Sequence, residues 1–198
     1  MGDGRVARGT RTREAIVDAT IALVREQGAG AVTHRSVAAR AGTSLAATTY
    51  HFATLDDLLV VAFELLTDRT VEEVERFAGL VLSGQMDLIE AASTFVAELD
   101  ADQGFGADGM LELAYAAIRN ERLRKPTQRL VDHLSAPFAD LIGAESARIL
   151  VRALNGVLLY HQAAGPEVGD AELRADVAAL FAHFGLTAAV RQRLEEAS

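Results

Sequence analysis

Apolar residues recur every three or four positions along most of the 198-residue chain, the spacing that places side chains on one face of an α-helix. In the first such stretch, from about Thr10 to Gln27, Ile16, Ala19 and Leu23 share a face, and Gly28 follows as a helix stop. The alternation of apolar and polar residues that marks half-buried strands is nearly absent. The pattern therefore predicts an all-α protein.

Glycine and proline divide the rest of the pattern into helices of ordinary length. The chain has only three prolines, and Gly84, Gly143 and Gly165 are among the clearest breaks. The predicted helices are, in chain order, 10–27, 34–41, 44–51, 55–81, 86–101, 109–122, 126–142, 144–163 and 169–195, the last with a break near Gly185. Residues 1–9 are predicted to form a flexible arm.

The segment from Thr33 to Phe52 has the layout of a helix-turn-helix, in which two short helices meet through a turn that contains glycine. The hydroxyls of Thr33 and Ser44 are placed to cap these two helices. Gly42, in the turn, is free to adopt a left-handed backbone conformation that a side chain resists. Val37 and Phe52 are expected to face the core, and a core position is also an open interpretation for Tyr50.

Charge is distributed unevenly along the chain, whose net charge is −9. Residues 1–55 hold seven arginines against four carboxylates, a net charge of +3, whereas residues 56–198 carry about −12. Only the N-terminal part is therefore expected to attract phosphate groups. The alternative interpretation is a solvated charged arm with no partner.

Several functional classes are disfavoured by what the sequence lacks. There is no cysteine, and the five histidines (34, 51, 133, 161 and 183) lie far apart, so we expect no metal site and no cofactor. No serine lies in a nucleophile-elbow pattern, so we predict no catalytic residues and no enzyme activity. Because no signal-peptide core or membrane span is present, we expect a cytoplasmic protein without a membrane partner.

From Arg11 to Leu59 the chain resembles the N-terminal domain of the TetR family of bacterial transcriptional regulators. The residues that carry the resemblance are Ile16, Ala19 and Leu23, then Gly30 with Thr33, Val37-Ala38-Ala39, Ala41-Gly42 with Ser44, His51-Phe52, and Asp56-Asp57-Leu58-Leu59. The resemblance implies a three-helix DNA-binding domain over residues 1–55. It also implies a larger helical domain over residues 56–198, for ligand binding and dimerisation.

The resemblance also implies which residues meet the double-stranded DNA operator. The second short helix is expected to lie in the major groove. The predicted DNA-binding residues are Thr33, Arg35, Ser44, Leu45, Ala46, Ala47, Thr49, Tyr50 and His51. Leu45, Ala46 and Ala47 are expected to press against thymine methyl groups. The residues expected to hold phosphates are Thr33, Arg35, Thr49, Tyr50 and His51.

Three positions depart from the residues usual in the family. Thr43 replaces a valine in the turn, Thr49 replaces a phosphate-binding tyrosine, and Leu55 replaces a lysine at the start of the fourth helix. A backbone phosphate contact is therefore either missing or moved to Tyr50, His51 or Thr54, and the sequence does not choose among these. Paired carboxylates such as Asp56-Asp57 are interpreted as solvated helix faces.

The resemblance implies a homodimer whose interface is formed by the helices of about 144–163 and 169–195. Broad apolar surfaces on both helices are compatible with that role. The family mechanism further implies a small-molecule effector that shifts the long fourth helix and releases the operator. Aromatic, methionine and histidine side chains suit the wall of such a pocket, and the predicted lining is Phe63, Phe95, Phe105, Met110, Tyr115, Tyr160 and His161.

Two other functions remain open. One is a helical protein-interaction module that does not bind DNA, which the weakly polar second helix and Leu55 favour. The other is a small helical enzyme, which no motif in the sequence favours. Salt-sensitive binding to random duplex fragments distinguishes these functions from a DNA-binding regulator.

Overall fold

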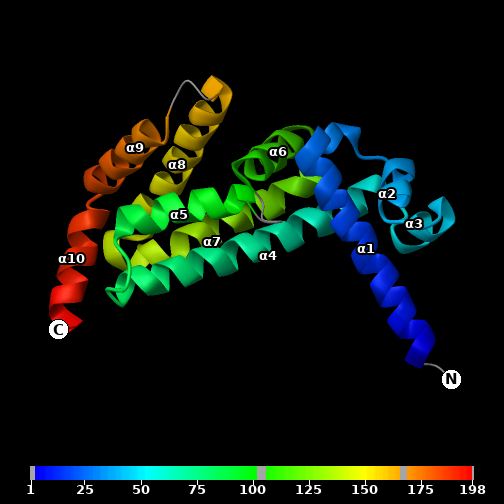
Figure 1. Ribbon diagram of the computed structural model, residues 1–198, viewed down its shortest axis with the longest axis horizontal. Coiled ribbons are helices and arrows are strands. Elements are labelled where there is room, and N and C mark those ends of the chain that lie inside the picture. Colours follow the sequence, from blue (N-terminus) through cyan, green and yellow to red (C-terminus); the bar gives the residue numbers. More distant parts are fainter. Residues whose placement is uncertain (1–2, 102–105, 166–168, 198) are drawn as a thin grey trace. The chain divides into compact units, whose positions relative to one another are not determined.

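The computed structural model describes residues 3–101, 106–165 and 169–197, and within these ranges the chain contains helices, turns and no strand (Figure 1). The α-helices are α1 (Asp3–Gln27), α2 (His34–Arg40), α3 (Leu45–His51), α4 (Leu55–Leu82), α5 (Leu88–Ala101), α6 (Gly106–Arg119), α7 (Arg124–Ile142), α8 (Ala144–Ala164), α9 (Asp170–His183) and α10 (Leu186–Ala197). Two short 3₁₀ helices, η1 (Ala29–Ala31) and η2 (Glu121–Leu123), precede α2 and α7. The predicted all-α class is confirmed.

The helices form two compact units. The first unit consists of Met1–Leu66 and Glu112–Thr127, and the second of Thr67–Leu111 and Gln128–Ser198. The chain crosses from one unit to the other within α4, within α6 and within α7. Each unit has its own set of buried apolar side chains, and the two are described separately below.

In the first unit, α1 packs against η1, α2 and α3 (Figure 1). The face of α1 predicted from the spacing of Ile16, Ala19 and Leu23 is buried, with exposed fractions of 6% or less. Val37 of α2 and Phe63 of α4 are fully buried as well. This core holds the two short helices and the turn between them in place.

Helix α1 begins at Asp3, so residues 3–9 are helical and the prediction of a flexible arm over residues 1–9 was wrong for them. This stretch contains no proline, and its arginines and alanine are good helix formers. Its two glycines do not prevent the helix. The hydroxyl of Thr12 also donates to the carbonyl of Arg8 at 3.0 Å, a bond within the helix.

In the second unit, α9 packs against α5, α8 and α10 (Figure 1). Its buried cluster includes Phe77 and Val81 of α4, Leu150 of α8, and Phe181 of α9. The predicted break near Gly185 is confirmed, because this glycine has a φ of 74° between α9 and α10.

The segment between α6 and α7 differs from its prediction. Helix α6 ends at Arg119 rather than near residue 122, and Asn120 then caps η2 by accepting a hydrogen bond from the N–H of Arg122 at 3.0 Å. Helix α7 begins at Arg124, before Pro126. A proline is tolerated in the first turn because a backbone N–H there has no partner within the helix.

Among the described residues no single helix is long and apolar enough to cross a membrane. The segments Ala171–His183 and Leu186–Ala197 meet the criterion of length and composition only when taken together, and they are bent by 70° at the break between them.

Candidate nucleic-acid interface and apolar cavity

The first short helix, α2, is held at its start by a capping box. Thr33 has an extended backbone, and its Oγ1 accepts a hydrogen bond from the N–H of Ser36 at 3.0 Å. In return the N–H of Thr33 donates to Oγ of Ser36 at 2.9 Å. The predicted cap at Thr33 is confirmed, and its partner Ser36 satisfies a second backbone donor at this helix end.

The turn between α2 and α3 depends on Gly42, whose φ of 61° lies in the left-handed region. A Cβ at this position would meet no atom within 4 Å, so the requirement for glycine comes from the backbone conformation and not from lack of space. Ser44 then caps α3, with its Oγ accepting from the N–H of Ala47 at 3.0 Å. Both predictions for the turn are confirmed.

Helix α3 packs on the rest of the first unit through Thr48 and its C-cap residue Phe52, which are 0% and 3% exposed. The hydroxyl of Thr48 donates to the carbonyl of Ser44 at 3.2 Å, which satisfies a polar group that is shielded from water. The guanidinium of Arg13 lies 5.1 Å from the centre of the Phe52 ring. Thr48 was not predicted from the sequence as a core residue, although its position four residues before Phe52 places it on the same helix face.

The opposite face of α3 is exposed and weakly polar. Leu45 is 46% exposed and Tyr50 is 84% exposed, while Ala46 and Thr49 are also exposed. The core interpretation of Tyr50 is therefore wrong, and its ring meets the edge of His51 at a centroid distance of 5.3 Å. Large exposed apolar groups on so short a helix are typical of a surface that meets a partner.

The polar groups predicted to hold phosphates differ in whether they already have hydrogen-bond or ion-pair partners within the protein. The hydroxyl of Thr49 donates to the carbonyl of Leu45 at 3.1 Å within α3. The hydroxyl of Thr33 serves the capping box described above. Arg35 is exposed on α2, and no ion pair involves it among the described residues.

Arg40 is committed to an ion pair within the first unit. Its Nη1 donates to Oε2 of Glu26 at 2.9 Å, and its Nη2 contacts Oε1 of the same carboxylate. The hydrogen bond from Arg40 holds the pKa of Glu26 below its ordinary value. One of the seven N-terminal arginines is thereby paired with a carboxylate, which reduces the field it presents to an external anion.

The start of α4 is tied to the segment after α6. Thr54 donates its hydroxyl to Oδ2 of Asp57 at 2.6 Å, and the N–H of Asp57 donates to Oγ1 of Thr54 at 3.1 Å. Arg122 reaches Oδ1 of Asp57 at 2.5 Å, and Nδ2 of Asn120 donates to Oδ1 of Asp56 at 2.8 Å. We call these contacts the α4 clasp.

The α4 clasp corrects the interpretation of Asp56-Asp57 as a merely solvated face. The hydrogen bond from Thr54, followed by the one from Arg122, holds the pKa of Asp57 below its ordinary value of 3.8. Because the hydroxyl of Thr54 is already used in this cap, Tyr50 and His51 are the less committed of the three candidates for the displaced phosphate contact.

A second long-range contact joins α6 to the start of η1, just after α1. Oε2 of Glu112 accepts a hydrogen bond from the N–H of Ala29 at 3.0 Å. Gly28 has a φ of 79°, and a Cβ there would lie 3.3 Å from both carboxylate oxygens of Glu112. No periodicity in the sequence points to this contact, because the two residues lie 83 positions apart.

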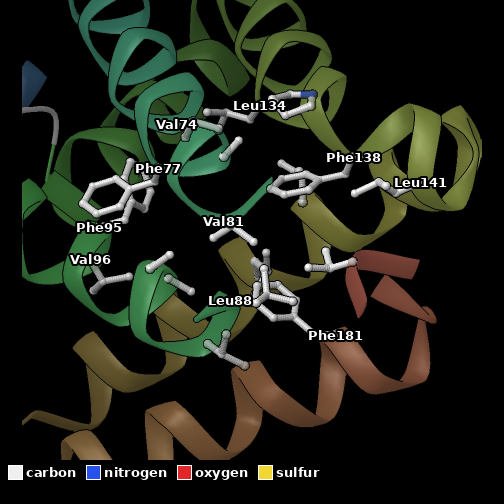
Figure 2. Close-up of a pocket in the computed structure, with 18 of the residues that line it drawn as sticks. Val74, Phe77, Val81, Leu88, Phe95, Val96, Leu134, Phe138, Leu141 and Phe181 are labelled. Atoms are coloured by element: carbon white, nitrogen blue, oxygen red, sulfur yellow. The ribbon is translucent and has the colours of Figure 1, made fainter. Parts of the chain in front are cut away.

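The second unit contains a cavity of about 120 Å³ (Figure 2). Its wall is formed by α4, α5, α7, α8, α9 and α10, and Phe77 and Phe95 meet edge to face there at a centroid distance of 6.0 Å. The described lining residues are Val74, Phe77, Ala78, Val81, Leu82, Leu88, Ala91, Ala92, Phe95, Val96, Leu134, Pro137, Phe138, Leu141, Val151, Leu154, Asn155, Leu158, Val177, Phe181 and Val190.

Phe95 is the one predicted pocket residue on the described wall of this cavity. Phe63 is fully buried in the first unit, and Tyr115 and Tyr160 are 55% and 61% exposed. His161 is buried, and its Nε2 lies 3.1 Å from Oδ2 of Asp176. Phe105 and the side chain of Met110 lie outside the described part of the chain.

Helix α8 has a buried face and an exposed apolar face. Ala147, Leu150 and Val151 are buried. On the other side Ile149 is 45% exposed and Tyr160 is 61% exposed. Between these two lie the half-buried Ala153 and Val157 and the exposed Gly156, at the spacing of one helix stripe.

Residues 16–66 match the family model described as bacterial regulatory proteins of the tetR family. The chain is 30% identical over 125 residues to the HTH-type transcriptional regulator CymR of Pseudomonas putida. That match covers 63% of this chain and 60% of CymR, so the chain spans less than two thirds of this curated relative's length.

Two solved structures are similar over nearly their whole length. A member of the TetR family from Streptomyces coelicolor A3, SCO1917, is 30% identical with a TM-score of 0.71, over 85% of this chain and 97% of that one. The multidrug binding protein EbrR complexed with ethidium is also 30% identical, with a TM-score of 0.70, over 85% of this chain and 98% of that one. The similarity therefore extends through both units.

Proposed function

The chain belongs to the TetR family of bacterial transcriptional regulators, and on that premise we propose that it is a repressor that binds an inverted-repeat operator as a homodimer and is released by a small molecule. The observation that carries this proposal is the exposed face of α3, a short capped helix that presents Leu45 and Tyr50 to solvent.

The exposed face of α3 suits entry into the major groove of duplex DNA. Leu45, Ala46 and the half-buried Ala47 lie in its first turn, the part of a recognition helix that reaches base edges. These side chains offer no bidentate hydrogen bond, so readout rests on apolar contact with thymine methyl groups. Ser44 fixes the start of the helix by accepting a hydrogen bond from the N–H of Ala47.

Phosphate contacts surround this helix in the proposal. Arg35 supplies the free charge, and Thr33, Thr49, Tyr50 and His51 supply polar groups beside it. Such contacts position a protein on the duplex without reading its sequence. The net charge of +3 over residues 1–55 favours this end of an otherwise acidic chain as the one that meets DNA.

The exposed stripe of α8 supports a two-fold dimer. Ile149, Val157 and Tyr160 lie on it, and covering such a patch removes apolar surface from water. In this proposal α8 and α9 of each chain pack against their copies in the partner. Two-fold symmetry matches an inverted repeat, in which successive major-groove faces lie about 34 to 36 Å apart.

The cavity of the second unit supports a response to a small molecule. It is lined from six helices, and one of them, α4, also begins immediately after the helix-turn-helix. A ligand that binds the DNA-incompetent state more tightly releases the operator, and a coupling of about 1 to 3 kcal/mol changes affinity 5- to 150-fold. We propose that residues 1–55 act as the DNA-binding domain and residues 56–198 as the effector and dimerisation domain.

Selection of genomic fragments by the purified chain tests the proposal. Bound fragments are recovered at low ionic strength, sequenced, and aligned for a shared inverted repeat. The expected result is an enriched repeat, bound by two chains, with an affinity that falls steeply as salt rises. Expression of a reporter behind that repeat then distinguishes repression from activation.

One result would contradict the proposal. A chain that is monomeric in solution and binds no double-stranded fragment at low salt is not an operator-binding repressor. In that case the exposed apolar face of α3 favours the alternative function of a protein-interaction module.

A further inference from the structure

The described wall of the cavity carries no charged side chain. Of the residues that line it, Asn155 is the only polar one among the described positions, and the others are aliphatic, aromatic or proline. A bound ion would give up its hydration shell and find no opposite charge on this wall, which disfavours binding strongly.

Aromatic rings from four helices contribute to the same wall. Phe77 of α4, Phe95 of α5, Phe138 of α7 and Phe181 of α9 are seen around the cavity in Figure 2. Phe77 and Phe95 already form an edge-to-face pair at 6.0 Å. Ring edges and faces at such distances also suit an aromatic guest.

The size of the cavity matches a small guest. Its volume of about 120 Å³ is slightly less than that of the engineered apolar cavity of about 150 Å³ that stays dry and binds benzene. A single ring with a short alkyl substituent fits this space after small side-chain shifts.

We propose that this cavity binds an uncharged, apolar molecule built on a single ring, and that it rejects ions of the same size. The proposal rests on the effector response proposed above, and it narrows the effector to one chemical class. It also separates this chain from EbrR, whose solved structure holds ethidium, because ethidium is a permanent cation.

Calorimetric titration of the purified full chain with three probes tests the charge selectivity. The probes are ethylbenzene, which is neutral, and benzylammonium and benzoate, which are ions of similar size at pH 7. Ethylbenzene is expected to bind saturably with one molecule per chain, and both ions at least tenfold more weakly. Binding of either ion within tenfold of ethylbenzene, or no binding of ethylbenzene, overturns the proposal.

Cavity-filling variants test the location. Ala92→Leu places extra carbon atoms on the wall and is expected to weaken ethylbenzene binding at least tenfold. Ala136→Leu is the matched control, because Ala136 is exposed on α7, outside the proposed dimer helices, and is not among the described lining residues, and it is expected to bind as the parent does. If Ala92→Leu lowers the helical content of the chain, Ala78→Leu, on another part of the wall, is used as the cavity-filling variant instead.

Unchanged binding in a folded filling variant places the ligand elsewhere and overturns the proposal. A separate measurement of operator binding distinguishes failure of this cavity assignment from failure of the proposed function. If ethylbenzene binds the cavity but the chain binds no duplex, the regulator proposal fails and the cavity assignment stands. If the chain binds its operator and ethylbenzene does not enter the cavity, only the assignment of ligand class fails.

Discussion

At the scale of single residues, the arginines of the first unit differ in what they offer to DNA. Arg40 is paired with Glu26, and Arg13 lies over the ring of Phe52, whereas Arg35 is exposed on α2 with no ion pair among the described residues. A charge that is already paired contributes little to an external field. Arg35 is therefore the arginine of the helix-turn-helix from which we expect the largest contribution to binding.

Arg35→Ala is expected to weaken binding to operator and random duplex alike, because a phosphate contact carries no sequence information. The slope of log affinity against log salt concentration is expected to become shallower by about one unit for each phosphate that the variant no longer neutralises. Fluorescence anisotropy at several salt concentrations measures both effects. Arg193→Ala, at an exposed position of α10, is the matched control and should leave both unchanged.

Leu45→Ala is expected to change sequence preference more than overall affinity. Leu45 is 46% exposed in the first turn of α3, and apolar contact with a thymine methyl discriminates between bases without a phosphate contact. Selection from a randomised operator compares the base preferences of the variant and the parent. An unchanged preference at every position would remove Leu45 from the readout surface.

Gly42→Ala is expected to destabilise the first unit by about 1 to 2 kcal/mol, the usual cost of a side chain in the left-handed region. Gly30→Ala is the matched control, because a Cβ at Gly30 also meets nothing within 4 Å and its φ lies outside that region. Thermal unfolding followed by circular dichroism compares the two. Equal stability of the two variants would show that the turn does not depend on its backbone conformation.

At the scale of elements, the start of α4 combines a capping box with an ion pair. Asp57 receives hydrogen bonds from Thr54 and from Arg122, and both favour its charged form, so its pKa is lowered. A lowered pKa means that the carboxylate stabilises the fold at pH values above its unfolded-state pKa of about 3.8. This stabilisation is lost as the pH falls through the lower pKa of the folded state.

Asp57→Asn is therefore expected to lower the unfolding temperature at pH 7, where the parent carboxylate is fully charged. The difference between parent and variant should narrow as the pH falls below about 3.8. Thermal unfolding over a series of pH values measures it. Glu75→Gln, at an exposed carboxylate on the same helix, is the control, and a difference that persisted undiminished into acid would contradict the assignment.

At the scale of the whole molecule, the exposed stripe of α8 carries the proposed two-fold assembly. Ile149→Lys is expected to shift the chain from dimer to monomer, because a charged group on a buried apolar interface is deprived of its hydration. Affinity for an inverted repeat should fall with it, since a monomer meets one half-site. Light scattering coupled to size exclusion measures the mass.

Ile118→Lys is the matched control for the dimer. Ile118 is 72% exposed on α6, compared with 45% for Ile149 on α8, and it belongs to the first unit. The same substitution there is expected to leave the mass unchanged. A dimer that survived Ile149→Lys and dissociated with Ile118→Lys would place the interface on α6.

Local features of this protein were determined by its sequence alone. The caps at Thr33 and Ser44, the left-handed turn at Gly42 and the break at Gly185 each depend on a few consecutive residues, so the sequence predicted them correctly. The bounds of most helices followed for the same reason. A helix start or stop is decided by backbone hydrogen bonds that its own neighbours provide or withhold.

The cavity and the long-range contacts were decided by the tertiary structure. Phe95 faces the cavity while Tyr115 and Tyr160 are exposed, although the aromatic side chains of all three led to the same prediction from the sequence. The bond from Ala29 to Glu112 and the α4 clasp join residues that are far apart along the chain. Helical periodicity shows which side chains share a face, but only the packing of several helices decides which of those faces enclose a space.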